Sequence, residues 1–197
     1  GRYHQPVEEE RIFLFMDLIG STALGRRLGD LGLQRLISRY AFDISTPILE
    51  HRGQIHAYIG DGVIVTWPFA RGVHNANCLK CFFAIQDTLG EQAPSYRAAF
   101  GTVPEIRGGL HGGSVIVSEI GDAKTAVVYS GDTVNTAARL EEAAKRHKEE
   151  LVTSGELIAR LKLPEDLQSK PLGTETLRGH EGPTKLVAIA RSRAGED

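Results

Sequence analysis

An apolar run of nine residues with one carboxylate inside it sets the first limit on the fold. The run is IFLFMDLIG at residues 12–20, and it is typical of a short buried strand that ends at a glycine. Asp17 interrupts the run, and a carboxylate in such a strand costs free energy to bury unless it has a partner. The run therefore predicts an interior strand whose Asp17 has a specific role.

The segments that follow alternate between helical and strand patterns. A helical pattern extends from about residue 21 to 51, and Pro47 is expected to kink or divide it. Gly60-Asp61-Gly62 separates two strand candidates and is typical of a hairpin turn. The remaining expected elements are strands at 54–59 and 63–67, a helix at 73–89, a loop, strands at 106–120 and 126–129, a helix at 133–146, a strand at 150–153, a helix at 154–161, and strands at 173–178 and 185–190. This order predicts an α+β domain with a mainly antiparallel sheet, covered by helices on one face.

Charge and hydropathy exclude some classes of partner. The chain has 23 basic and 25 acidic residues, a formal charge of -2, and a nucleic-acid-binding surface would favour a basic balance. It contains no apolar run near the roughly 20 residues of a membrane-spanning helix, and it has no leader pattern. We expect no nucleic-acid partner, no membrane segment in this chain and a cytoplasmic location. An upstream sensor or membrane region in a longer parent protein stays open.

Asp61 is the second acid in an unusual place. It occupies the tip of the expected hairpin, where an aspartate by itself is most often a turn residue. If its strands and the strand of Asp17 are neighbours in one sheet, both carboxylates lie at the same end of that sheet. Two carboxylates at one point suit Mg²⁺ or Mn²⁺, which complete their coordination with water and phosphate oxygens. The pair therefore predicts a site for divalent metal ions.

The residues directly after Asp17 predict a phosphate site beside these acids. Leu18, Ile19, Gly20, Ser21 and Thr22 form a glycine turn that opens a helix. The free N–H groups and the positive dipole end at a helix N-terminus favour phosphate. Candidate metal ligand and candidate phosphate-binding amides thus occur within six residues.

A third motif, GDTVNTAARLE at residues 131–141, places Asn135 and Arg139 four residues apart. On a helix these two side chains project from the same face. A neutral donor and a fixed cation on one face can orient a ribose and stabilise charge on a phosphorus centre. The alternative for this motif alone is an ordinary exposed helix in which Arg139 pairs with Glu141 or Glu142.

Five segments in this order make the chain resemble the catalytic domains of class III adenylyl and guanylyl cyclases, most of all the bacterial members. They are FMDLIGST, YIGDGVIVTWP, the R-x-G-L-H-x-G pattern at residues 107–113, GDTVNTAARLE and LRGHEGPTKLVAI. The likeness extends from residue 11 to about residue 191 and implies the ferredoxin-like, palm-type class III cyclase fold. It divides the chain into a flexible N-terminal tail at 1–10, a cyclase catalytic domain at 11–192 and a C-terminal tail at 193–197.

The resemblance also implies a chemistry and a set of roles. A nucleoside triphosphate, with ATP as the first choice, would be converted into a 3′,5′-cyclic nucleotide and pyrophosphate. Asp17 and Asp61 would hold two divalent metal ions, Mg²⁺ or Mn²⁺. Asn135 would position the ribose, and Arg139 would stabilise the transition state.

In that family the site is shared between two protomers. One protomer supplies the aspartates and its head-to-tail partner supplies the asparagine and the arginine, so a homodimer with two equivalent sites is implied. Arg178 or His180 stands where the family has a basic residue near the terminal phosphates. His56 and His111 are expected to be structural rather than general bases.

The chain departs from the family where the base is recognised. The family's base-reading positions, usually a lysine and an Asp, Thr or Ser, fall on Ala57 and Val128, which cannot make those hydrogen bonds. Base selectivity is therefore expected to be relaxed or redirected, and a cyclase acting on UTP or CTP is an alternative. A non-catalytic, nucleotide-binding regulatory module is a further alternative, and the four retained residues of the reaction centre argue against it.

Overall fold

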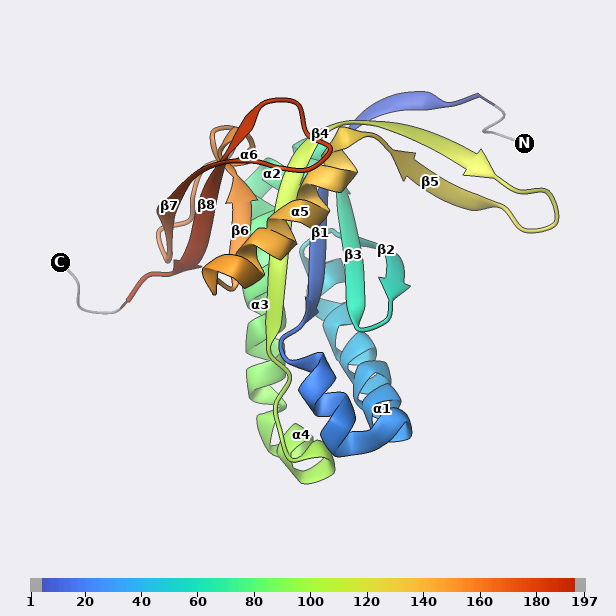
Figure 1. The fold of residues 1–197 in the computed structure, drawn as a ribbon, viewed down its shortest axis with the longest axis vertical. Coiled ribbons are helices and arrows are strands. Elements are labelled where there is room, and N and C mark those ends of the chain that lie inside the picture. Colours follow the sequence, from blue (N-terminus) through green and yellow to red (C-terminus); the bar gives the residue numbers. More distant parts are fainter. Residues whose placement is uncertain (1–4, 194–197) are drawn as a thin grey trace.

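One mixed sheet organises the computed structural model, which describes residues 5–193. Eight strands form this sheet within the described residues, and a layer of helices covers each of its faces (Figure 1). The elements in chain order are β1 (Val7–Leu18), α1 (Ser21–Glu50), β2 (Gln54–Ile59), β3 (Gly62–Pro68), α2 (Phe69–Val73), η1 (His74–Ala76), α3 (Asn77–Glu91), α4 (Ala93–Phe100), β4 (Ile106–Ile120), β5 (Ala126–Ser130), α5 (Asp132–His147), β6 (Leu151–Ser154), α6 (Gly155–Ile158), β7 (Leu167–Thr176) and β8 (Pro183–Arg191).

The strand order is β2-β3-β1-β4-β6-β8-β7, with β5 paired to the outer part of β4. Every neighbouring pair is antiparallel except β4 and β6, which run parallel. This confirms the expected α+β class with a mainly antiparallel sheet. It also places β1 in the interior of the sheet, between β3 and β4, as the apolar run at 12–20 predicted.

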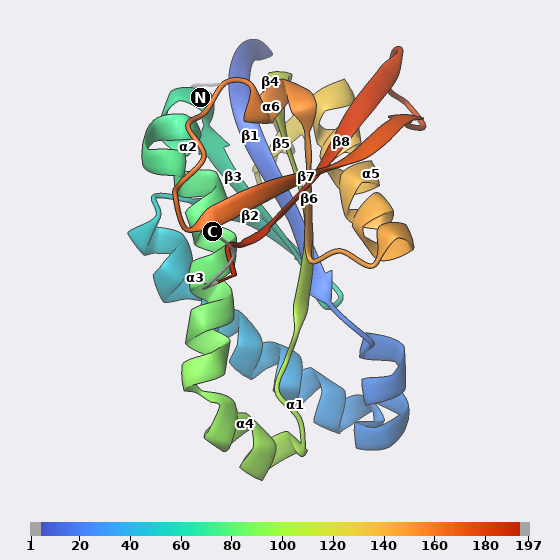
Figure 2. The same cartoon turned by 90° about the vertical axis from the view of Figure 1, so that its left-hand side faces the viewer.

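The expectation of helices on one face only is wrong. Ile12, Leu14 and Met16 of β1 pack with the buried residues of α1 and α3, whereas Phe13 on the opposite face packs with Ala137 of α5. Successive side chains of a strand point to opposite faces, and both sets are apolar here, so both faces of β1 need cover. Figure 2 shows α3 and α5 on opposite sides of the strands.

Helix α1 breaks at a different residue from the one expected. Pro47 is accommodated near its C-terminal end, and the backbone leaves helical geometry at Gly29 instead, with φ 73° and ψ 172°. Glycine adopts this conformation without the Cβ penalty that other residues incur. None of the helices in the described part of the chain combines the length and the apolar character needed to cross a bilayer.

Two further boundaries differ from the sequence-based expectation. Strand β1 begins at Val7, because residues 7–10 pair with the outer part of β4, and so they belong to the sheet rather than to a tail. A short helix, α4, forms within the segment expected to be a loop. Residues 1–4 and 194–197 of the two expected tails lie outside the described residues.

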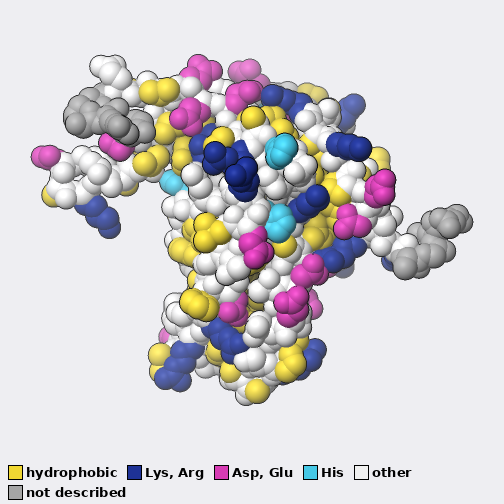
Figure 3. Space-filling model, turned by 180° about the vertical axis from the view of Figure 1, so that it is seen from behind, with side chains coloured by type: hydrophobic (Ala, Val, Ile, Leu, Met, Phe, Trp, Pro, Cys, Tyr) yellow, Lys and Arg dark blue, Asp and Glu magenta, His cyan; other side chains and the backbone are white. Residues whose placement is uncertain are grey.

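The surface behind the sheet mixes charges of both signs. Seen from behind, Lys and Arg side chains alternate with Asp and Glu side chains over this face (Figure 3). The distribution agrees with the formal charge of -2 for the whole chain.

Helix α5 lies unusually close to β4. A Cβ atom added at Gly109 would stand 2.1 Å from the backbone nitrogen of Glu141 and 2.6 Å from the carbonyl oxygen of Ala137. Backbone atoms cannot move aside as the end of a side chain can. The glycine therefore sets how closely α5 packs on the sheet, and with it the position of every side chain that α5 carries.

We predict that Gly109→Ala lowers the free energy of unfolding by at least about 2 kcal/mol, because the new methyl group forces α5 away from β4. Gly90→Ala is the matched control, since Gly90 lies within α3 with no atom near the added Cβ, and this change should be neutral or stabilise by up to about 1 kcal/mol. Urea denaturation followed by circular dichroism measures both. Equal midpoints for the two variants would contradict the close approach of α5.

Candidate active site

The two aspartates meet at one end of the sheet. Met16 pairs with Val63 at the end of the β1–β3 ladder, so Asp17 lies beside the turn between β2 and β3 that carries Asp61. Both carboxylates border one cavity of about 240 Å³. Its lining residues are Phe15, Met16, Asp17, Ile59, Asp61, Gly62, Val63, Ile64 and Glu141.

The glycine turn next to Asp17 opens α1 as expected, but not all of its amides are free. Gly20 adopts the left-handed conformation, with φ 72°, and no side chain caps the helix. Leu18 belongs to the β1–β4 ladder, and the Ile19 amide donates a 2.8 Å hydrogen bond to the carbonyl oxygen of Glu105. The amides available for phosphate are therefore those from Gly20 onward, including Ser21 and Thr22, at the N-terminus of α1.

A third carboxyl group, which the sequence-based reading missed, completes the cavity. Glu141 of α5 lies in hydrogen-bonding contact with Asp17. Burial and the neighbouring Asp17 raise the pKa of Glu141 to about 8, and the positive charge of Arg107 acts in the opposite direction. Arg107 is the β4 residue directly opposite Asp17 in the ladder.

The sequence alone suggests Glu141 only as an ion-pair partner of Arg139. At 100° per residue, however, these side chains lie about 160° apart around α5. The helical period alone predicts that Glu141 and Arg139 point in different directions. The contact between Glu141 and Asp17 depends on how α5 crosses β1, which the sequence does not show.

Divalent metal ions fit the residues present. Oε1 of Glu141 and the hydroxyl oxygen of Tyr40 are buried atoms without a hydrogen-bond partner. Tyr40 belongs to α1 and is close enough to Asp17 and Asp61 that their charges, added to its burial, raise its pKa. A cluster of hard oxygen donors with unsatisfied buried atoms suits Mg²⁺ or Mn²⁺. Within residues 5–193 no three His, Cys, Asp or Glu side chains are placed so that together they could hold a metal ion. An ion here would be held by the two aspartates, and water or phosphate oxygens would supply the remaining ligands.

Asn135 and Arg139 do not join this cavity. Asn135 is exposed on the outer face of α5, and Arg139 is half-buried one turn later, with Nη1 2.7 Å from Glu142 Oε1 and with a buried Nε that has no hydrogen-bond partner in the part of the chain that the structure describes. The sheet-facing side of the same helix carries Ala137 and Leu140, which are fully buried. The fold therefore brings Asp17 and Asp61 together and keeps Asn135 and Arg139 on a separate surface.

The two base-pocket candidates are also separated. Ala57 packs with Phe13 and Tyr129 on the α5 side of the sheet, whereas Val128, adjacent to Tyr129 on β5, points to the other side. A bulge in β2 at His56 brings its ring 4.8 Å from that of Tyr129. Burial and the charge of Arg11 lower the pKa of His56.

The two basic residues of the C-terminal segment that were candidates for a phosphate contact, His180 and Arg178, differ in their surroundings. His180 is held within the protomer, with Nδ1 2.6 Å from Asp132 Oδ2. Arg178 is exposed and has no side-chain partner among the described residues. Arg178 is therefore the residue of the two whose charge is available to a ligand.

Comparison with known proteins identifies the family of the chain. The model of the adenylate and guanylate cyclase catalytic domain matches residues 3–190, nearly the whole chain. The chain belongs to this family. The cyclase domain is 40% identical over its full 197 residues to adenylate cyclase 2 of Rhizobium meliloti (strain 1021), and it spans 54% of that relative's length.

Solved structures agree on the fold. The crystal structure of the adenylyl cyclase CyaB from P. aeruginosa superposes with a TM-score of 0.82 at 23% identity, covering 96% of this chain and 98% of that one. The guanylyl cyclase Cya2 superposes with a TM-score of 0.78 at 18% identity, covering 97% of this chain and 96% of that one. The same fold thus occurs in proteins named for different bases.

Folding raises the pKa of Glu141 from about 4.5 to about 8. We therefore predict that the metal-free cyclase domain loses stability as the pH rises from about 4.5 to about 8, because Glu141 loses its proton in that range. The folded state holds this proton more tightly than the unfolded state does, so raising the pH favours unfolding. Glu141→Gln should remove this part of the pH dependence and raise Tm at pH 8. Tm measured in EDTA at several pH values between about 4.5 and 8 tests this pH dependence. Glu142→Gln is the control, because Glu142 is half-exposed. Parallel pH curves for the wild type and Glu141→Gln would show that Glu141 is not protonated beside Asp17.

Proposed function

We propose that this domain is an adenylate cyclase that converts ATP into 3′,5′-cyclic AMP and pyrophosphate. The observation that carries the proposal is the meeting of Asp17 and Asp61 at one cavity beside the open N-terminus of α1. Carboxylates for metal ions and amides for phosphate are what a triphosphate substrate needs in one place. The likeness to a protein named adenylate cyclase supports ATP as the substrate.

Each residue has a distinct role in the proposed reaction. The ribose 3′-oxygen forms a bond to the α-phosphorus, the bond from that phosphorus to the bridging oxygen breaks, and pyrophosphate leaves. Two divalent ions held by Asp17 and Asp61 would supply Lewis-acid chemistry, lowering the pKa of the 3′-hydroxyl and neutralising phosphate charge. Asn135 orients the ribose, and Arg139 stabilises the charge that develops on the transferring phosphorus.

We propose further that two copies of the chain share each site. Arg139 and Asn135 do not line the cavity of the aspartates, so one protomer by itself lacks a complete reaction centre. A head-to-tail homodimer places these two side chains of one protomer against the cavity of its partner. Exposed apolar side chains at both ends of the sheet support such an interface. They are Tyr58 and Ile59 near the β2–β3 turn and Ile116, Ile120 and Val127 on the β4–β5 hairpin.

Base choice in the proposed reaction follows from the side chains at the two base-reading positions. Ala57 and Val128 offer no side-chain hydrogen bond to a base, and this favours a relaxed preference that could extend to UTP or CTP. We place the activity in the cytoplasm, where nucleoside triphosphates are available.

We predict that the purified domain with Mn²⁺ forms a cyclic product, detectable by mass, and that ATP gives the highest kcat/KM of the four nucleotides. Asp17→Asn and Asp61→Asn should each abolish turnover without loss of fold, because each removes a metal ligand and relieves repulsion between carboxylates. Circular dichroism provides the folding control. A dimer that binds nucleotide but forms no product from ATP, GTP, CTP or UTP would indicate a regulatory module instead.

The shared site has a separate test by complementation. An Asp17→Asn protomer mixed with an Arg139→Ala protomer should recover activity that neither has alone, because one of the two sites in the heterodimer then contains only native residues. Subunit exchange is verified with two affinity tags on the same sample. No recovery in a sample with proven exchange would contradict the head-to-tail arrangement.

A further inference from the structure

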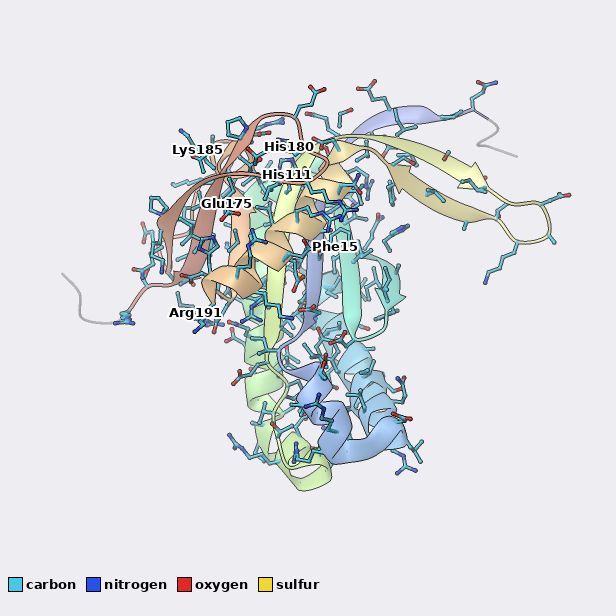
Figure 4. The ribbon with its side chains drawn as sticks, viewed as in Figure 1. Phe15, His111, Glu175, His180, Lys185 and Arg191 are labelled. Carbon is cyan, nitrogen blue, oxygen red and sulfur yellow. The ribbon has the colours of Figure 1, made fainter. Side chains whose placement is uncertain are left out.

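The C-terminal hairpin formed by β7 and β8 holds helix α5 near both of its ends. At the C-terminal end of α5, Arg146 and His147 contact Glu175 of β7 at 2.6 Å and 2.8 Å. At the N-terminal end, His180 of the β7–β8 loop contacts Asp132. Figure 4 shows His180 and Glu175 on the part of the chain that crosses over α5.

His180 is the centre of the N-terminal contact. Its side chain is 10% exposed, and its Nδ1 lies 2.6 Å from Asp132 Oδ2 and 3.0 Å from Thr136 Oγ1. Its Nε2 lies 3.7 Å from Glu156 Oε1 of α6. A buried ring with polar neighbours on two helices fixes a geometry more firmly than an exposed ion pair does.

A second histidine supports the first from the sheet. The ring of His111 on β4 meets the ring of His180 edge-on, with centroids 6.0 Å apart, and both are labelled in Figure 4. His111 Nδ1 lies 2.6 Å from Ser154 Oγ, which also accepts the amide of Leu157 at the start of α6. Burial lowers the pKa of His111 to about 4, so it packs as a neutral ring. His180 is thus held from β4, α5 and α6.

Leu177 anchors the start of the loop in an apolar cluster with buried side chains of α5, and the second anchor is His180. Gly179 and Gly182 on either side of it have φ angles of 83° and 77°, and an added Cβ at either would meet no atom within 4 Å. Glycines with this freedom give the loop little conformational preference of its own. The contacts of His180 therefore hold the loop beyond Leu177 on α5, and Arg178 lies between these two anchors.

These contacts lie beside the proposed reaction groups. Asp132 and Thr136 each stand three residues before Asn135 and Arg139 respectively, so the two pairs occupy adjoining strips of α5. A shift of the helix at His180 would displace both reaction groups together.

We infer that His180 is a positioning residue of the cyclase site. It fixes the β7–β8 loop on α5, so Asn135, Arg139 and Arg178 keep a constant position relative to one another. All three then face a nucleotide that is bound at the aspartates of a second protomer. The inference rests on the proposed function. Its mechanism is geometric, because side chains that act on a transition state lose much of their effect when displaced by about 1 Å.

The test compares three substitutions at His180 in the whole domain. His180→Ala removes both the ring and the hydrogen bond, His180→Phe keeps a ring against His111, and His180→Asn keeps a donor near the position of Nδ1. We expect kcat to fall roughly ten- to hundred-fold in the Ala and Phe variants, with a smaller change in KM, and to recover in large part in the Asn variant. Amide hydrogen exchange should quicken between Asp132 and Arg139 in the first two variants only.

His147→Ala is the matched control. It removes the same type of side chain from the same helix–hairpin contact, about 18 Å along α5 from Asn135. It should lower Tm but leave kcat unchanged. All kinetics are measured below the unfolding transition of each variant.

Two results would overturn the inference by itself. Equal kcat for His180→Ala and the wild type would show that the contact does not position the site. Recovery by Phe as complete as by Asn would show that only packing matters. A wild-type domain that forms no cyclic product from any of the four nucleotides would instead overturn the proposed function, and this inference with it.

Discussion

Asp17 lies at the end of a strand that is buried on both faces, and the surrounding structure must compensate the negative charge of its carboxylate. Asp61 arrives from the neighbouring turn and Glu141 from α5, so three acidic side chains border one small cavity. Arg107 contributes positive charge from the opposite strand, and a proton on Glu141 relieves part of the repulsion. A divalent cation would relieve this repulsion more effectively, because the carboxylate oxygens would then bind one positive ion. The repulsion between these carboxyl groups, which is predicted to lower the stability of the metal-free domain at high pH, would be relieved by a cation at the two aspartates.

Helix α5 links this cavity to the second half of the proposed reaction centre. Its inner side packs on Gly109 at a distance set by backbone atoms, and Glu141 at the edge of that side reaches Asp17. Its outer side carries Asn135 and Arg139, which are directed away from the same cavity. A rigid helix with a reaction group on each side links the two half-sites of a protomer, so the inferred His180 contact near the N-terminal end of α5 bears on the reaction groups that this helix carries.

A structure with two separated half-sites has a direct consequence for assembly. Under the proposed mechanism, neither half-site of a protomer would act without the complementary half-site of another, and a two-fold arrangement would supply both at the same interface. The apolar side chains exposed on the β4–β5 hairpin and near the β2–β3 turn are the surfaces that such an arrangement would cover. The activity of the domain would then depend on protein concentration and on whatever brings two copies together.

The amino-acid sequence by itself determined the strand that contains Asp17, the hairpin at Asp61, the glycine turn at Gly20 and the pairing of Asn135 with Arg139 on one helical face. These features depend on local periodicity and on glycine geometry, which short segments express directly. Only the tertiary structure decided that α5 covers the opposite face of the sheet from α1 and α3, because an apolar strand pattern does not say which helix covers which side. It alone decided that α1 breaks at Gly29 rather than at Pro47, that Glu141 meets Asp17 and that His180 is held by α5. Each of these depends on contacts between segments far apart in the chain, where the crossing of a helix over a strand, not the local pattern, sets which atoms meet.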